Sequence, residues 1–272
     1  PGRLSRERAG SDEGRGRRVC AATDDAPTGG RQGLAARTDN GGRVYVVWSG
    51  FDQQLNSGVF CQVTSDNGGA TFTRPRVVTT VGGIGQLDPV TGRFTIDGVA
   101  GSRTDVFPSI DIANGAPTGT AAPNTIVLGW SDNSASANKE KAYVRYSTNR
   151  GTSYSPPVAV STPGDRANQP AVAISPNGTT VYMTYNAWHQ PWQATTAAPR
   201  PMEGVVLSGP ALGTLAEVNR GASGDARASS ANSLTAEFLG DSNYALASNT
   251  HGATVCNDAR TATPCPPRDA NR

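Results

Sequence analysis

The sequence lacks the features that mark several large classes of protein. Its 272 residues carry a formal net charge of only +2, which gives no electrostatic basis for binding nucleic acid. No apolar run is long enough to span a bilayer, so membrane insertion is not expected. His189 and His251 stand alone and no Cys-x-x-Cys spacing occurs, so we expect no zinc site and no other metal or cofactor.

The chain begins at Pro1, with no Met and no apolar leader segment, so we expect a processed chain or a fragment. The four cysteines permit at most two disulfides, in three connectivities. Cys256 and Cys265 flank a short loop that contains proline and could pair with each other. Cys256 could equally be a buried thiol.

Glycine and proline are abundant, at 32 and 19 residues, and only 36% of the chain is hydrophobic. This composition is rich in turns and poor in helix formers. A chain of this length can build one large domain with a hydrophobic core. We therefore expect a single all-β domain.

Two segments, 65–72 and 147–154, share the pattern Ser-x-Asn-x-Gly-x-(Ser/Thr)-aromatic. Each lies between two strand-like runs. The Asn side chain caps its own backbone, Gly accepts a positive φ, and the aromatic returns the loop to the sheet. The pattern resembles the Asp-box, Ser-x-Asp-x-Gly-x-Thr-Trp, of sialidase-type β-propellers. Asn67 and Asn149 replace the Asp, and Phe72 and Tyr154 replace the Trp.

The two corners belong to a longer repeat of about 60–70 residues. Each unit has an opening strand, a turn, a second strand that ends in an aromatic residue, a polar loop and a third strand. Opening strands are predicted at 33–37, 109–113, 171–175 and 244–248, second strands at 44–48, 126–130, 181–185 and 253–256, and third strands at 59–63, 142–146 and 204–207. The β-branched and aromatic enrichment favours four-stranded antiparallel blades.

The sialidase-like family has six blades, whereas about four are visible in this chain. We therefore predict a sialidase-type β-propeller that is six-bladed or a partial ring, formed by residues 30–272. Residues 1–29 are predicted to be disordered or a partial N-terminal segment. The aromatic residues that end the second strands, Trp48, Trp130 and Tyr185, are predicted to pack between blades.

The order of strands predicts which loops share an end of the ring. Connections between blades, and those between second and third strands, lie at one end, which we call the mouth. The Ser-x-Asn-x-Gly corners lie at the opposite end, which we call the corner end. Binding residues are usually carried by such loops on a rigid scaffold. Arginines precede the innermost strands at Arg31, Arg103, Arg166 and Arg227.

Sialidases of this family bind the sugar carboxylate with three arginines, because guanidinium forks match a carboxylate. They use a tyrosine polarised by a glutamate as nucleophile and an aspartate as acid. The resemblance implies the following candidates: Arg103, Arg166 and Arg227 for the carboxylate; Tyr185 or Tyr244 as nucleophile; Glu203 or Glu237 beside it; Asp52, Asp105 or Asp132 as acid; Trp188 and Trp192 for stacking on sugar.

Each candidate also has a structural interpretation. A Gly-x-Arg turn in every blade is explained by pairing of the arginine with a neighbouring Asp105, Asp165 or Asp225. Trp188 and Trp192 can cap the ring. The Arg-Ile-Pro motif of catalytic sialidases is missing, and Arg74-Pro75 lies on the corner end.

We therefore carry three hypotheses for a secreted or cell-surface bacterial protein whose partner is a glycan or glycoconjugate. The first is a retaining glycoside hydrolase acting on sialic acid or another acidic terminal sugar. The second is a non-catalytic propeller that binds glycan or protein at its mouth. The third is a structural module of a larger chain.

Overall fold

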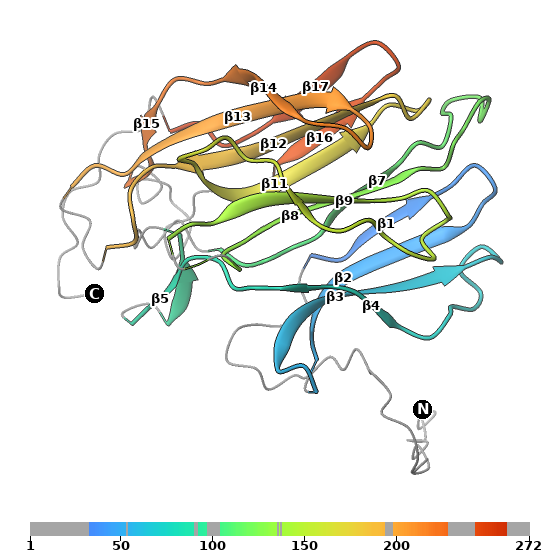
Figure 1. The fold of residues 1–272 in the computed structure, drawn as a ribbon, viewed down its shortest axis with the longest axis horizontal. Coiled ribbons are helices and arrows are strands. Elements are labelled where there is room, and N and C mark those ends of the chain that lie inside the picture. The colour runs from blue at the N-terminus through green and yellow to red at the C-terminus, as the bar shows by residue number, and fades with distance from the viewer. Residues whose placement is uncertain are drawn as a thin grey trace, which may run out of the picture.

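The computed structural model describes residues 33–52, 54–89, 92–96, 104–134, 136, 138–193, 198–227 and 243–259. These residues form three successive four-stranded antiparallel sheets and two hairpins (Figure 1). In each sheet, strands that are adjacent in sequence pair with each other, so every sheet is a meander. The predicted all-β fold with four-stranded blades is confirmed.

Blade 1 contains β1 (Ala35–Thr38), β2 (Val44–Asp52), β3 (Ser57–Ser65) and β4 (Arg76–Val81). Blade 2 contains β7 (Ser109–Ile112), β8 (Ile126–Asp132), β9 (Lys141–Ser147) and β10 (Val158–Ala159). Blade 3 contains β11 (Arg166–Ile174), β12 (Thr180–Trp188), β13 (Pro201–Pro210) and β14 (Ala216–Arg220), with β15 (Gly224–Asp225) paired to the start of β13. The hairpins are β5 (Gln86–Asp88) with β6 (Arg93–Thr95), and β16 (Tyr244–Ala247) with β17 (Gly252–Val255).

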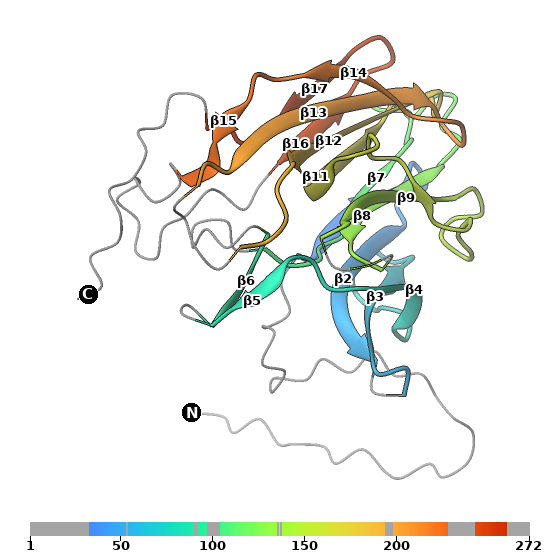
Figure 2. The same ribbon diagram turned by 60° about the vertical axis from the view of Figure 1, so that its left-hand side comes forward.

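The blades pack face to face and fan out in an arc (Figure 2). The first strands β1, β7, β11 and β16 contact one another in turn, so they form the inner side of the arc. Strand β8 lies in the middle blade and is buried along its whole length. Gly129 in β8 allows blade 3 to approach closely, because a Cβ atom there would lie 2.3 Å from Val172.

Two hydrophobic cores fill the spaces between blades. The core between blades 1 and 2 includes Trp130, which stacks on Tyr143 at a centroid distance of 5.5 Å and meets the edge of Phe60 at 5.8 Å. The core between blades 2 and 3 includes Met183 and the ring of Tyr185. Packing of Trp130 and Tyr185 between blades agrees with the role predicted from the repeat.

The two corners have identical internal hydrogen bonds. In the first, Ser65 Oγ accepts from Gly69 N at 2.9 Å, and Asn67 Oδ1 accepts from Thr71 N at 2.9 Å. In the second, Gly151 N donates to Ser147 Oγ and Ser153 N to Asn149 Oδ1, both at 2.9 Å. Each corner joins the third and fourth strands of its blade, at the end opposite the start of β11. The predicted separation of corner end and mouth is confirmed for these elements.

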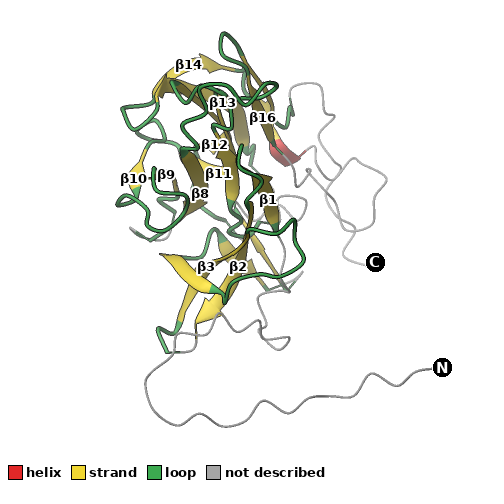
Figure 3. Cartoon of the chain, turned by 90° about the vertical axis from the view of Figure 1, so that its right-hand side faces the viewer, coloured by secondary structure: helices red, strands yellow, loops and turns green. Residues whose placement is uncertain are grey.

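Several details differ from the sequence-based expectation. Strand β14 and the hairpin β5–β6 were not predicted, because their residues are exposed or the strands are very short. Of the two alternatives left open for Cys256, a disulfide with Cys265 or a thiol, the structure shows the free thiol, while Cys61 is disulfide-bonded. Figure 3 shows strands and loops with a single short helical turn at Ala226. The predicted boundary at residue 29 lies outside the described residues.

Candidate functional site

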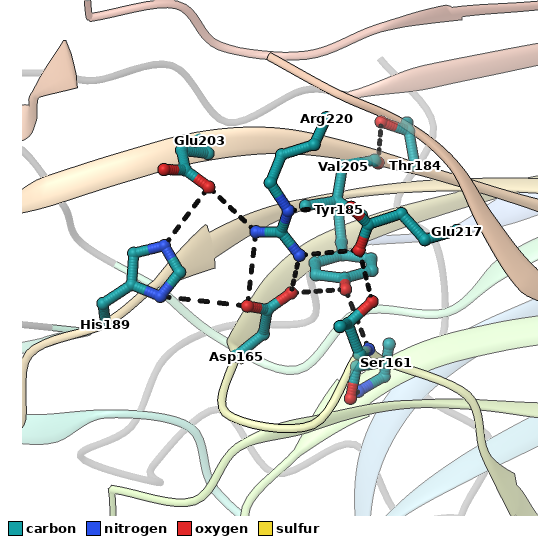
Figure 4. A network of polar contacts seen from close by, with 11 residues as sticks. Ser161, Asp165, Thr184, Tyr185, His189, Glu203, Val205, Glu217 and Arg220 are labelled. Atoms are coloured by element: carbon teal, nitrogen blue, oxygen red, sulfur yellow. Dashed lines mark hydrogen bonds and ion pairs between the residues drawn. The ribbon is translucent and has the colours of Figure 1, made fainter. Parts of the chain in front are cut away.

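A polar network occupies the mouth end of blade 3, where β12 ends and β13 begins (Figure 4). Its centre is Arg220, the last residue of β14. The guanidinium lies 2.8 Å from Asp165, 2.9 Å from Glu203 and 2.7 Å from Glu217. Three carboxylates therefore share one arginine. This arrangement raises the pKa of Arg220 above its usual range, chiefly through the hydrogen bonds that Arg220 donates to Glu217.

Tyr185 joins this network through its hydroxyl, which donates to Asp165 Oδ2 at 2.7 Å and accepts from Thr162 N at 3.0 Å. Burial, followed by the hydrogen bond to Asp165, raises the pKa of the Tyr185 phenol above its usual range. A phenol held protonated in this way is a poor nucleophile. The network therefore gives Tyr185 the character of a structural hydrogen-bond donor.

Glu203 is the predicted catalytic carboxylate that lies in this network. It was expected in a loop, whereas it is part of β13. His189 Nε2 lies 3.3 Å from Glu203, and His189 Nδ1 lies 3.8 Å from Asp165. Burial alone would raise the pKa of Glu203, but hydrogen bonds from Arg220 and His189 outweigh it and lower the pKa. Glu203 is thus held as a carboxylate, suited to accept a proton and not to donate one.

The arginines predicted to bind a sugar carboxylate have other partners. Arg166 is buried, with Nε 2.6 Å from Glu140 Oε2 and Nη2 2.9 Å from Glu140 Oε1. Arg227 pairs with Asp225 at 2.6 Å, as the structural interpretation of the repeat expected. Arg103 lies outside the described residues, as does Glu237. A convergence of three arginines is therefore not seen among the described residues.

A cavity of about 300 Å³ lies on the inner side of the arc, between β1, β7, β11 and β16. Two residues that were predicted for catalysis line it. Asp105 lies in the connection that leads into β7, and Tyr244 is the first residue of β16. Tyr244 is 66% exposed, and Asp105 is exposed as well, although neighbouring groups partly desolvate its carboxyl. Phe107, Gln169 and Asn243 also line it, together with Arg37, Ser109 and Ser131.

Asp105 is the acid–base candidate of this cavity. Desolvation raises the pKa of its carboxyl, although a hydrogen bond from Val106 N at 2.7 Å acts in the opposite direction. A carboxylic acid with a raised pKa retains its proton at a higher pH, which is the property required of a general acid. Asp105 therefore differs chemically from Glu203, whose pKa is lowered.

A backbone irregularity shapes the opposite wall of the cavity. The pairing of β11 with β12 shifts register between Asn168 and Ala171, and Gln169 there has a φ of 50°. Bulges re-aim side chains next to functional sites. Asn243 Nδ2 donates to the carbonyl of Gln169 at 2.7 Å, while Asn243 Oδ1 is buried and receives no hydrogen bond from the described residues.

The remaining candidates lie elsewhere in the structure. Asp52 accepts hydrogen bonds from two backbone amides of its own turn, and Asp132 accepts from the indole of Trp130 at 2.8 Å. Trp188 is buried at the end of β12. Trp192 is half-buried and donates from Nε1 to Thr95 at 2.9 Å. None of these four residues lines the cavity.

Neither the central position of Arg220 in the polar network nor the presence of Gln169 and Asn243 in the cavity wall was predicted from the sequence. Arg220 belongs to β14, which carries no periodic signal. Gln169 reaches the cavity only because of the register shift. Asn243 directly precedes Tyr244, a nucleophile candidate, and this position was the available signal.

Within the described ranges, no group of three or more His, Cys, Asp and Glu residues is arranged to hold a metal ion. In the same part of the chain, no helix has the length and apolar character needed to cross a membrane.

No protein-family model matches the chain, and no curated protein matches it. Among solved structures, the chain is similar to a mutant of the α-L-arabinofuranosidase Arb93A of Fusarium graminearum in complex with an iminosugar inhibitor. The identity is 15%, the match covers 83% of this chain and 57% of that one, and the TM-score is 0.44. The α-L-arabinanase of Penicillium chrysogenum complexed with arabinobiose matches at 16% identity, covering 79% and 54%, with a TM-score of 0.43.

A GH43 protein, BlXynB of Bacillus licheniformis, matches at 10% identity, covering 83% and 48%, with a TM-score of 0.32. The chain thus spans little more than half the length of the first two structures. Likeness at this level concerns the arrangement of strands and carries no argument about activity. None of the three is named as a sialidase, so the resemblance based on the corners remains a prediction.

Proposed function

We propose that this chain is a glycoside hydrolase that binds a terminal sugar of a glycan in the cavity between β1, β7, β11 and β16, which we call the axial cavity. The observation that carries the proposal is the meeting of Asp105, Tyr244 and Asn243 in one cavity of about 300 Å³. A concave site with a few convergent polar groups and a group of perturbed pKa is the usual form of an active site.

In the proposed reaction, protonated Asp105 donates its proton to the glycosidic oxygen as the bond to the leaving group breaks. The amide side chains of Gln169 and Asn243 in the cavity wall offer hydrogen-bonding groups to sugar hydroxyls, and Phe107 offers an apolar face. The retaining pathway assigns the attack on the anomeric carbon to Tyr244, with Glu237, outside the described residues, as its base. Water then hydrolyses the glycosyl intermediate.

Specificity for sialic acid or another acidic sugar is the finer part of the proposal. It depends on Arg103, because Arg166 and Arg227 have carboxylate partners of their own. A secreted or cell-surface location is also proposed. The disulfide at Cys61 supports it, because disulfides persist in oxidising compartments.

The test is turnover of fluorogenic glycosides between pH 4 and pH 8, with a sialoside, a glucuronide and neutral sugars in one panel. We expect release of the fluorophore on the acidic side, where Asp105 is protonated, and a loss of at least about 100-fold in Asp105→Asn. Asp66→Asn is the matched control, because this substitution removes the same charge at the corner end, where Asp66 pairs with Arg43.

Non-catalytic glycan binding is the second candidate, and one observation favours it. Asp105 is the only carboxylate among the described residues that line the cavity, whereas most glycosidases use two. If no glycoside turns over but a glycan array shows binding that Tyr244→Ala abolishes, the binder is correct. If neither turnover nor binding is found, both candidates are wrong.

A further inference from the structure

Two arginines that have no acidic partner among the described residues lie between blades 1 and 2, beside the outermost strand of blade 1. Arg76 is the first residue of β4 and Arg145 belongs to β9. The guanidinium carbon of each lies 5.9 Å from the centroid of the Tyr154 ring. Cation–π contacts of this kind orient guanidinium groups without neutralising their charge.

The hydrogen bonds of Arg145 hold it in place. Its Nη1 donates to the carbonyl of Val78 at 2.6 Å and its Nη2 to that of Tyr154 at 3.2 Å, and its Nε donates to the carbonyl of Ser155. These three carbonyls bridge the outer strand of blade 1 and the corner of blade 2. They carry no net charge, so the positive charge of Arg145 remains uncompensated.

Arg76 has far fewer contacts. Its one hydrogen bond within the described residues is a long one, 3.4 Å from Nη2 to Gln62 Oε1, an oxygen that also accepts from the Tyr154 hydroxyl at 2.7 Å. A guanidinium has five N–H donors, so most of those on Arg76 are available to a ligand. Arg76 is nevertheless only partly exposed.

Arg76 and Arg145 differ from other arginines of the described residues in having no carboxylate beside the guanidinium group. Arg43, Arg150, Arg166 and Arg220 each face a carboxylate. For Arg76 and Arg145, the one titratable neighbour is Tyr154, and desolvation lowers the pKa of both guanidinium groups. Arg74 is exposed two residues before Arg76 and adds a third positive charge to the same connection. A partly desolvated positive charge without a counter-charge is costly unless an anion completes the site.

We propose that Arg76 and Arg145, which both contact the ring of Tyr154, form a binding site for a tetrahedral oxyanion, sulfate or phosphate. Arg76 supplies the free N–H donors in the fork geometry that matches two oxygens of such an ion. Arg145, fixed by carbonyls, supplies the second charge. The site lies away from the axial cavity and does not depend on the function proposed for that cavity. The oxyanion is either a free ion or a group carried by a glycan.

The test is calorimetric titration with inorganic sulfate and with phosphate, at an ionic strength held constant with sodium chloride. We expect saturable binding that weakens at least about tenfold in Arg76→Gln and less in Arg76→Lys. The matched control is Arg43→Gln, which removes the same charge from a paired arginine at the corner end and should leave the affinity unchanged.

A heparin-derived tetrasaccharide separates the two sources of the oxyanion. Tighter binding than inorganic sulfate, reduced by Arg74→Gln, would identify a glycan-borne group, and equal affinity would identify a free ion. Equal sulfate affinities for Arg76→Gln and Arg43→Gln would overturn the proposal. If Arg76→Gln does not fold, the wild-type chain is treated with phenylglyoxal, which modifies arginine, with and without sulfate. We expect sulfate to protect Arg76 from modification. Equal modification with and without sulfate would overturn the proposal.

Discussion

The two Ser-x-Asn-x-Gly corners share their internal hydrogen bonds but differ in what surrounds them. Phe72, the aromatic residue of the first corner, is 47% exposed. Its counterpart Tyr154 packs against the core between blades 1 and 2 and donates to Gln62 at 2.7 Å. After the asparagine, the first corner has Gly68, whereas the second has Arg150, which pairs with buried Asp39 of blade 1 at 2.9 Å.

The difference teaches that the pattern specifies a local turn and not its role in the fold. Both turns satisfy their own backbone amides, as an Asx-type corner does anywhere. Only the second lies against a preceding blade. Its aromatic side chain therefore does not return to its own sheet, as the sequence predicted, but joins one blade to the next.

The largest difference between the corners is expected from removing the aromatic rings. Tyr154→Ala should lower the free energy of unfolding by about 3 kcal/mol, because it empties part of the core between blades. Phe72→Ala should change it by less than about 0.5 kcal/mol. Urea unfolding followed by circular dichroism measures both values, and similar losses in the two variants would show that the corners are equivalent.

The next difference concerns Asp39. Burial alone would raise its pKa, but the backbone N–H of Arg43 and the side chains of Arg150 and Tyr45 outweigh it and hold the pKa below its usual value. A depressed pKa adds stability above the unfolded pKa, and this stability is lost as the pH falls through the folded pKa.

Asp39→Asn should therefore cost about 2 kcal/mol at pH 7, and its deficit relative to the wild type should shrink as the pH falls below about 4. Asp66→Asn is the control in the first corner, where the carboxylate is exposed, and should have a much smaller effect at every pH. A deficit for Asp39→Asn that does not change with pH would contradict the assigned role of its charge.

Glycine substitutions give a smaller contrast. Gly69 and Gly151 both have positive φ, 91° and 74°, so Ala at either should cost about 1 kcal/mol in backbone strain. A Cβ at Gly151 would also lie 2.9 Å from Gln62 and 3.1 Å from Tyr45, whereas at Gly69 the nearest atom is 3.8 Å away. Gly151→Ala should thus be the more destabilising by about 1 kcal/mol in thermal unfolding. The reverse order would mean that the two corners do not differ in packing as described.

The smallest expected effect is the same in both corners. Asn67 Nδ2 donates to Thr71 Oγ1, and Asn149 Nδ2 donates to Ser153 Oγ, both at 2.8 Å. In Asn67→Asp and Asn149→Asp the hydroxyl can rotate and become the donor, so each variant should stay within about 0.5 kcal/mol of the wild type. Unequal shifts in melting temperature would show that the surroundings also govern this bond.

The candidate site was predictable only in part. Asp105 and Tyr244 were candidates through the resemblance to sialidases, and the strand order places both at the mouth, where the chain enters an innermost strand. Glu203 was correctly expected at the mouth, but its contacts with Arg220 and His189 depend on side chains from β14 and from the residue that follows β12. The partner of Arg166 is Glu140 of the preceding blade, which no spacing within the repeat indicates.

The sequence by itself determined the blades and their corners, because strand alternation, β-branched residues and Asn-Gly turns act over a few neighbouring residues. It also determined which end of each blade carries which loop, since a meander leaves no alternative. Only the tertiary structure decided which charges meet, which aromatic side chain is buried and where Gln169 points. Those outcomes depend on how one blade packs against the next, and packing involves residues that are far apart in the chain.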